Sequence, residues 1–96
     1  MINSLTKIEK KYFNQMLKIF YLYSTNKLEK ISPPLDKIYT DLNNKESYQN
    51  IIDALNYSGF IYVELRPGYI TNGVPELNYT GNLTKDGIEY IKKFLD

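Results

Sequence analysis

The sequence contains no cysteine, no histidine and no tryptophan among its 96 residues. Without cysteine there is no disulfide framework, no thiol nucleophile and no cysteine metal site. Without histidine the chain lacks the usual zinc ligand and the usual general base near neutral pH. The 11 acidic residues are scattered, and no motif pairs two carboxylates or sets oxygen ligands at calcium-loop spacing. We therefore expect no enzyme, no metal and no cofactor.

Arginine, strong net charge and long apolar runs are scarce as well. Arg66 is the only arginine, and the net charge is +1, well short of the strongly basic balance typical of nucleic-acid-binding proteins. No apolar run approaches the roughly 20 residues that a membrane span needs, and the N-terminal residues lack the order of a signal peptide. We expect a cytoplasmic protein with no membrane contact.

The residues that are present have the balance of a folded protein. Apolar residues make up 43% of the chain and charged residues 24%. A chain of 96 residues fits one domain with a modest core, so we expect residues 1–96 to form a single domain.

The first helix is indicated by "TKIE", in which Thr6 can cap the helix while Glu9 reaches back to form a capping box. The helix should run from about Lys7 to about Tyr23. Its buried stripe comprises Phe13, Met16, Leu17 and Phe20. The apolar arc is wider than one contact requires, since it also includes Ile8, Tyr12, Ile19 and Tyr23. We infer two neighbours for this helix, one being the core and the other either the C-terminal helix or a second subunit.

Two shorter helices should follow. Ser32 is the expected cap of a helix from about Pro33 to Leu42, because proline is tolerated in a first helical turn. Its stripe comprises Leu35, Ile38, Tyr39 and Leu42. Asn43 or Asn44 can cap a third helix, from about Lys45 to Tyr57, which Gly59 ends in the left-handed region. The stripe of that helix comprises Tyr48, Ile51, Ile52 and Leu55.

The hydrophobic period then changes. The β-branched and aromatic residues of "FIYVEL" predict a strand over Phe60–Leu65, which "RPG" should end. A second strand is predicted over Glu76–Leu83, and the two should pair as a hairpin. Thr84 should cap a last helix with a buried stripe of Ile88, Ile91 and Leu95. The resulting fold class is α+β, with the order ααα-β-β-α.

This order resembles the winged-helix superfamily, in which a helix-turn-helix precedes a two-stranded wing. The segments "ALNYSGFIYVE" and "LTKDGIEYIKKFL" look like the third-helix exit and the C-terminal tail of such domains. Among winged helices the chain is most similar to the small YjcQ-like proteins of bacteria and their prophages, over about Lys7 to Leu95. The resemblance implies a winged helix-turn-helix with a two-stranded wing and a C-terminal helix, and the usual role of the superfamily is binding duplex DNA.

The residues give this role mixed support. Helical phase places Glu46, Asn50, Asp53 and Tyr57 on the outward face of the third helix, with Gln49 at its edge. Two carboxylates there oppose phosphate, although Asn and Gln can bond an adenine edge. The candidate DNA-binding residues are Lys45, Gln49 and Asn50 on the helix and Arg66, Tyr69 and Asn72 on the wing. Ordinary polar surface is the alternative for the first group, and Arg66 can instead pair with Glu64 across the hairpin.

Apolar and aromatic residues outside the expected core raise a second possibility. Tyrosine is enriched at protein interfaces, and the ten tyrosines are more than so small a core needs. AT-rich coding, which also explains the many Lys, Ile and Asn residues, is an equally good account of them. The candidate interface residues are Ile8, Tyr12, Ile19, Tyr23 and Tyr90.

The sequence therefore leads to two hypotheses. The first is a small winged-helix transcriptional regulator of a prophage or other mobile element, which binds duplex DNA as a homodimer. The alternative is a winged-helix protein-interaction module, an adaptor or inhibitor, which binds a protein partner and no DNA.

Overall fold

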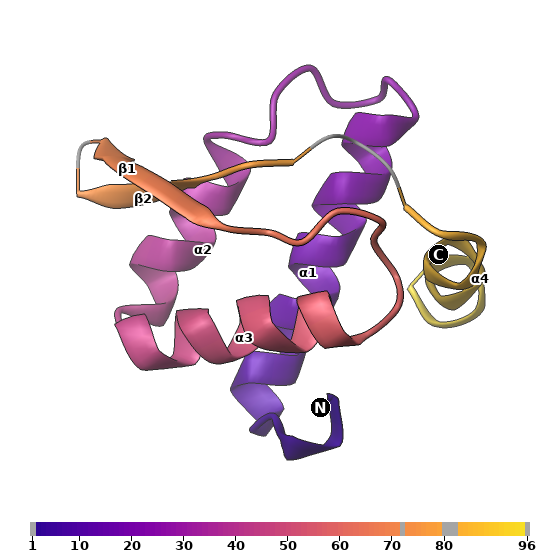
Figure 1. Ribbon diagram of the computed structural model, residues 1–96, viewed down its shortest axis with the longest axis horizontal. Helices are drawn as coiled ribbons and strands as arrows, with labels where there is room; N and C mark the ends of the chain where they lie inside the picture. Colours follow the sequence, from indigo (N-terminus) through magenta and orange to yellow (C-terminus); the bar gives the residue numbers. More distant parts are fainter. Residues whose placement is uncertain (1, 72, 80–82, 96) are drawn as a thin grey trace.

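The computed structural model describes residues 2–71, 73–79 and 83–95 and shows an α+β arrangement (Figure 1). The described part contains four α-helices and a two-stranded antiparallel sheet, in the predicted order, after a short 3₁₀ helix. The elements are η1 (Ile2–Ser4), α1 (Lys7–Ser24), α2 (Pro34–Leu42), α3 (Lys45–Tyr57), β1 (Pro67–Thr71), β2 (Val74–Leu77) and α4 (Lys85–Phe94).

The predicted capping box begins α1. The Glu9 backbone N–H donates to Thr6 Oγ1 at 3.1 Å, and the Thr6 N–H donates to Glu9 Oε1 at 3.0 Å. The predicted stripe of α1 is fully buried, and α1 packs against α2, α3 and α4. The C-terminal helix α4 is thus a neighbour of α1, but it contacts Phe13, Asn14 and Lys18 and not the flank of Ile8, Tyr12, Ile19 and Tyr23 for which a second neighbour was predicted.

Asn43 and Asn44 connect α2 to α3. Asn43 ends α2 in the left-handed conformation, and Asn44 caps α3 by accepting the Ser47 N–H at 3.0 Å. The predicted bounds of α3 are confirmed, and Gly59 follows it with φ +77°. The predicted cap of α2 is wrong, because the Ser32 hydroxyl donates to the Asp36 carboxylate at 2.7 Å instead.

The hairpin forms from other residues than predicted. The prediction of a first strand over Phe60–Leu65 is wrong: β1 begins at Pro67, within the "RPG" segment that predicts a break. Proline is tolerated as the first residue of a strand, because its missing N–H is not needed there. The second strand was predicted over Glu76–Leu83. The observed strand β2 instead runs over Val74–Leu77, and residues 80–82 of the predicted strand lie outside the described residues.

One contact of the predicted hairpin is present in the structure. Ile61 and Leu83, near opposite ends of the two predicted strands, form an isolated antiparallel bridge. The Thr84 N–H also donates to the Phe60 carbonyl at 2.9 Å, so the segment after α3 is joined to the start of α4. Thr84 caps α4 as predicted, accepting the Gly87 N–H at 3.0 Å.

The core lies where α1 meets the other helices. Figure 1 shows α3 crossing in front of α1, with the hairpin at one side and α4 at the other. Ile91 of the predicted α4 stripe is buried, and Ile88 and Leu95 are half-buried. No helix in the described part of the chain is long and apolar enough to cross a membrane. The buried apolar residues are Phe13, Met16, Leu17, Phe20, Leu35, Ile38, Tyr48, Ile51, Ile52, Ala54, Leu55, Leu65, Leu83 and Ile91.

Candidate nucleic-acid interface

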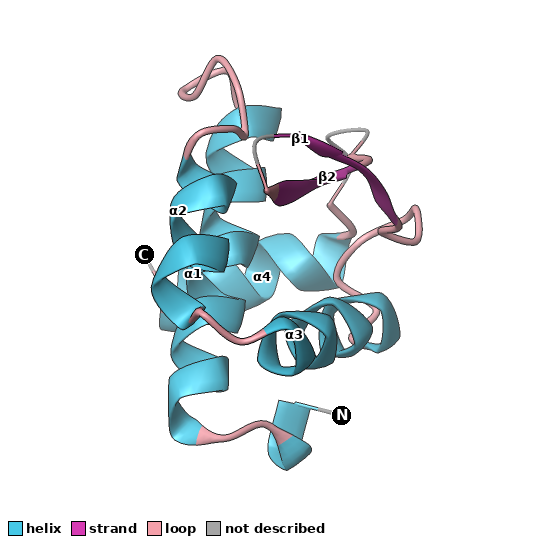
Figure 2. Cartoon of the chain, turned by 90° about the vertical axis from the view of Figure 1, so that its left-hand side faces the viewer, coloured by secondary structure: helices cyan, strands magenta, loops and turns pink. Residues whose placement is uncertain are grey.

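The N-terminus of α3 and the turn of the hairpin border one groove. The groove has a volume of about 390 Å³ and is lined by Tyr39, Thr40, Asn43, Asn44, Lys45, Gly73 and Val74. Figure 2 shows the hairpin above α3 on the same side of the molecule. A helix N-terminus carries partial positive charge, and Lys45 adds a full one. The described lining of the groove contains no carboxylate.

The outward face of α3 is polar, as helical phase predicts. Lys45, Glu46, Gln49 and Asn50 are exposed, and Asp53 is half-buried. The Gln49 amide donates to Asp53 Oδ1 at 2.9 Å, an i,i+4 bond on the helix surface. Because this bond is exposed, water or a ligand can replace it at little cost.

The Asn50 side chain, unlike that of Gln49, is hydrogen-bonded to another helix. Its amide donates at 3.1 Å to Glu9 Oε2 on α1, and the Glu9 side chain is 5% exposed. The hydrogen bond from the Thr6 backbone lowers the pKa of Glu9 by more than burial raises it, and bonds from Asn50 and Ser47 lower that pKa further. Asn50 therefore connects α3 to the first turn of α1.

The sequence held a signal for this contact. Glu9 precedes Phe13 by four positions and Met16 by seven, so helical phase places its carboxylate on the buried face of α1. A buried carboxylate needs hydrogen-bond donors from a neighbouring element. Such a donor had to come from a polar residue of a packed helix, and Asn50 supplies it.

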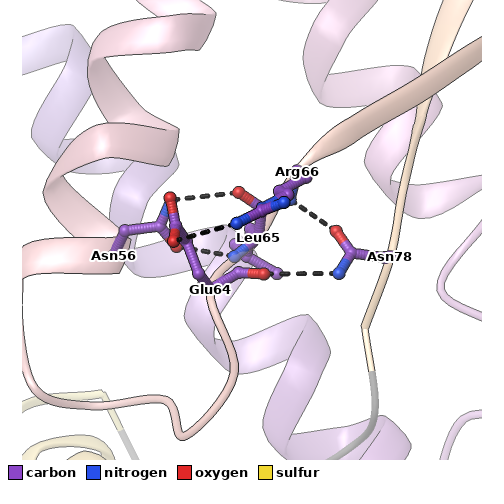
Figure 3. Close-up of polar contacts among 5 residues, drawn as sticks. All are labelled: Asn56, Glu64, Leu65, Arg66 and Asn78. Atoms are coloured by element: carbon purple, nitrogen blue, oxygen red, sulfur yellow. Dashed lines mark hydrogen bonds and ion pairs between the residues drawn. The ribbon is translucent and has the colours of Figure 1, made fainter.

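Arg66 lies in the segment that leads into β1 (Figure 3). Its guanidinium is 3.8 Å from Glu64 Oε2, with both side chains mostly exposed. The predicted pairing of these two residues is confirmed, but both precede β1, so the pair does not cross the hairpin. An exposed pair at this distance contributes little to stability, which leaves Arg66 able to exchange Glu64 for a phosphate.

Two asparagines fix the backbone around Arg66. The Asn56 side chain accepts the Leu65 N–H at 2.7 Å and donates to the Leu65 carbonyl at 3.0 Å. Asn78 accepts the Arg66 N–H and donates to the Glu64 carbonyl at 3.3 Å. The backbone groups of Leu65 that a strand would use are therefore bonded to side chains, as Figure 3 shows.

The other two candidate DNA-binding residues of the wing, Tyr69 and Asn72, are described only in part. Tyr69 lies within β1, but its side chain, like the whole of Asn72, lies outside the described residues. The structure thus brings Lys45 to the hairpin turn, and it places Gln49 one turn further along α3.

The five candidate interface residues do not form one surface. Tyr12 and Ile19 are half-buried against the core, and half-buried Tyr23 has its ring against Tyr79. Ile8, by contrast, is 63% exposed. Tyr90 lies on α4, with its hydroxyl donating to Asn14 Oδ1 at 2.7 Å on another side of α1. Burial raises the pKa of Tyr90, which keeps this donor protonated.

Comparison of the chain with models of protein families, with curated proteins and with solved structures found no match. Its function therefore has to be inferred from its own residues.

Proposed function

We propose that the protein is a small winged-helix transcriptional regulator that binds duplex DNA through the N-terminal half of α3 and the hairpin turn. The observation that carries the proposal is the groove that Lys45 and Gly73 share. In helix-turn-helix proteins the N-terminal residues of the second helix contact base edges, while nearby groups contact the backbone. A hairpin turn beside that N-terminus suits both contacts.

Each candidate takes a role from its surroundings. Lys45 would contact a phosphate, and Arg66 would do the same after releasing Glu64. Gln49, whose bond to Asp53 is exposed, would read an adenine edge. Asn50 has no such role in the proposal, because its amide donates to the buried Glu9 carboxylate.

Affinity for DNA should be low for one copy, because Glu46 and Asp53 repel phosphate. A homodimer would compensate, since the first bound copy raises the effective concentration of the second. Each neutralised phosphate contributes a slope of about −0.9 to log K against log salt, so Lys45 and Arg66 give about −1.8 per copy and about −3.6 per dimer.

The test is selection from a random duplex DNA library, followed by fluorescence anisotropy of the enriched duplex at about 50 and about 200 mM salt. We expect Lys45→Glu to abolish binding and Gln49→Ala to relax the enriched sequence. Lys30→Glu is the matched control, because Lys30 is exposed in the loop between α1 and α2. Absence of any enriched duplex, or equal loss of binding in Lys30→Glu, would refute the proposal.

A second candidate function is a protein-interaction module, an adaptor or inhibitor, that binds no DNA. The observation that favours it is the pair of carboxylates on α3, Glu46 and Asp53, which repel phosphate. In addition, the Asn50 amide is hydrogen-bonded to Glu9 and does not face DNA freely. Failure of the duplex selection with retention of a protein partner would favour this candidate.

A further inference from the structure

A second groove lies at the other end of α3. It has a volume of about 580 Å³ and is lined by Asn3, Lys10, Asn14, Tyr57, Ser58, Tyr90, Phe94 and Leu95. These residues come from the N-terminal segment, α1, the end of α3 and α4. We call it the aromatic groove.

Large aromatic side chains are exposed at the aromatic groove. Tyr57 is 76% exposed and Phe94 is 62% exposed, although they come from different helices. Single exposed apolar residues are ordinary, but convergence of two of them on one hollow marks an interaction surface. Aromatic residues are also enriched at the centres of protein interfaces.

The charged side chains that border the aromatic groove most directly are lysines. Lys10 lines it, Lys7 lies one turn before Lys10, and the Lys93 ammonium lies 5.4 Å from the ring centroid of Phe94. No carboxylate belongs to the described lining, although Asp53 lies one turn before Tyr57 on α3 and Asp86 lies one turn before Tyr90 on α4. The C-terminal ends of α3 and α4 add partial negative charge, and the Lys18 ammonium offsets part of it by donating to the Leu95 carbonyl at 3.0 Å.

This charge argues against a second copy of the chain as the occupant. In a two-fold symmetric dimer the same patch meets itself, so Lys10 and Lys93 of one copy would face the same lysines of the other. Like charges placed opposite each other across an interface cost several kcal/mol. An occupant of opposite charge fits better.

Ring packing argues against single-stranded nucleic acid, which binds by stacking bases on free aromatic faces. The Tyr90 ring centroid is 4.7 Å from that of Phe60 and 5.1 Å from that of Phe94. Lys93 covers another part of Phe94. Because Tyr90 and part of Phe94 already have these neighbours, Tyr57 offers the largest exposed ring of the groove, at 76%. One such ring is better suited to an inserted side chain than to a row of bases.

We propose that the aromatic groove docks an acidic segment of a partner protein, with one large apolar side chain against Tyr57 and Phe94 and carboxylates at Lys10 and Lys93. The site is separate from the α3 N-terminus and the hairpin, so it stands whether or not the chain binds DNA.

The test is selection from a random peptide library on the immobilised protein, followed by anisotropy with the enriched peptide. We expect enriched peptides that combine Asp or Glu with a large apolar residue. Removing two central aromatic anchors should weaken binding about a hundredfold in Tyr57→Ser/Phe94→Ser, and Lys10→Glu should weaken it about tenfold. Both aromatic residues are exposed, so the double variant should keep its fold, which far-UV circular dichroism checks.

The matched control is Tyr62→Ser/Val63→Ser, which removes exposed apolar side chains outside the aromatic groove. It and Lys45→Glu should bind the peptide with unchanged affinity. Enrichment of basic peptides, no enrichment above the Tyr57→Ser/Phe94→Ser variant, or tighter binding of an oligo-dT probe would overturn the proposal. The proposal would also be overturned if sedimentation showed a dimer that Tyr57→Ser/Phe94→Ser dissociates and Tyr62→Ser/Val63→Ser does not.

Discussion

The bond between Glu9 and Asn50 gives the sharpest prediction about this molecule. Asn50 was a candidate for base recognition, and the structure uses its amide to hold the first turn of α1. If Asn50 has this structural role, its loss should change the free energy of unfolding. If it only faces DNA, its loss should change DNA binding alone.

The magnitude follows from the hydrogen bonds of the Glu9 carboxylate. Its two oxygens accept the Thr6 N–H at 3.0 Å and the Asn50 amide at 3.1 Å. A hydrogen bond to a charged group contributes about 1.5–3 kcal/mol. Because both bonds share one carboxylate, we expect Glu9→Ala to lower the unfolding free energy by about 2–4 kcal/mol. Asn50→Ala, on a more exposed residue, should lower it by about 1 kcal/mol.

Urea denaturation of the two single variants and the double variant completes a double-mutant cycle. The coupling energy should be about 1 kcal/mol, because each residue loses its partner in the other's variant. Coupling within about 0.3 kcal/mol of zero, the range of independent sites, would refute the structural role of Asn50.

The same pair predicts a pH dependence. The pKa of Glu9 is lowered from the ordinary value of 4.5 in the folded state, so the carboxylate stabilises the fold above pH 4.5. That stabilisation should disappear as the pH falls through the lowered folded pKa. The difference in unfolding free energy between the natural chain and Glu9→Gln should therefore shrink with acidification below pH 4.5. A constant difference would contradict this assignment.

Two further changes test the packing. A Cβ added at Gly87 would lie 2.4 Å from the Phe60 carbonyl oxygen. Gly87→Ala should therefore push α4 away from the segment after α3 and lower the thermal midpoint, at a cost of about 1–3 kcal/mol in unfolding free energy. An unchanged midpoint would contradict the close approach of Gly87 to Phe60. The Tyr48 hydroxyl is buried without a hydrogen-bond partner in the described structure, and burial, with a smaller effect of Asp36, raises its pKa to about 12. In urea denaturation, Tyr48→Phe should therefore raise the free energy of unfolding by up to about 1 kcal/mol. Tyr90→Phe should lower it by about 1 kcal/mol, because it removes the bond to Asn14. Equal effects of the two changes would contradict this difference.

The helices could be predicted because their signals are local. The bounds of α3 follow from Asn44 at one end and Gly59 at the other, and the capping box of α1 lies within four residues. The hairpin could not be placed in the same way. The Asn56 and Asn78 side chains bond the backbone of Leu65 and Arg66, which lie 9 and 12 residues away in the sequence. No local sequence pattern predicts hydrogen bonds over such separations.

The candidate site was predictable in the same uneven way. Helical phase predicts Glu46 on the outward face of α3 and Gln49 at its edge, and both residues are exposed in the structure. It also placed Asn50 there, because phase describes one helix and not the neighbour that the side chain meets. The aromatic groove joins residues of four segments, so only the folded chain brings Tyr57, Tyr90 and Phe94 together.

The two proposed surfaces lie at opposite ends of one helix. Lys45 begins α3 and Tyr57 ends it, 12 positions later, which at about 1.5 Å per residue is a distance of about 18 Å. We therefore expect a DNA duplex at the N-terminal end and a peptide at the C-terminal end to bind at the same time. Since α3 is anchored to α1 by Asn50 at its middle, neither ligand needs to move the other's site. The simplest expectation is therefore additive binding, with peptide affinity the same in the presence and absence of saturating duplex.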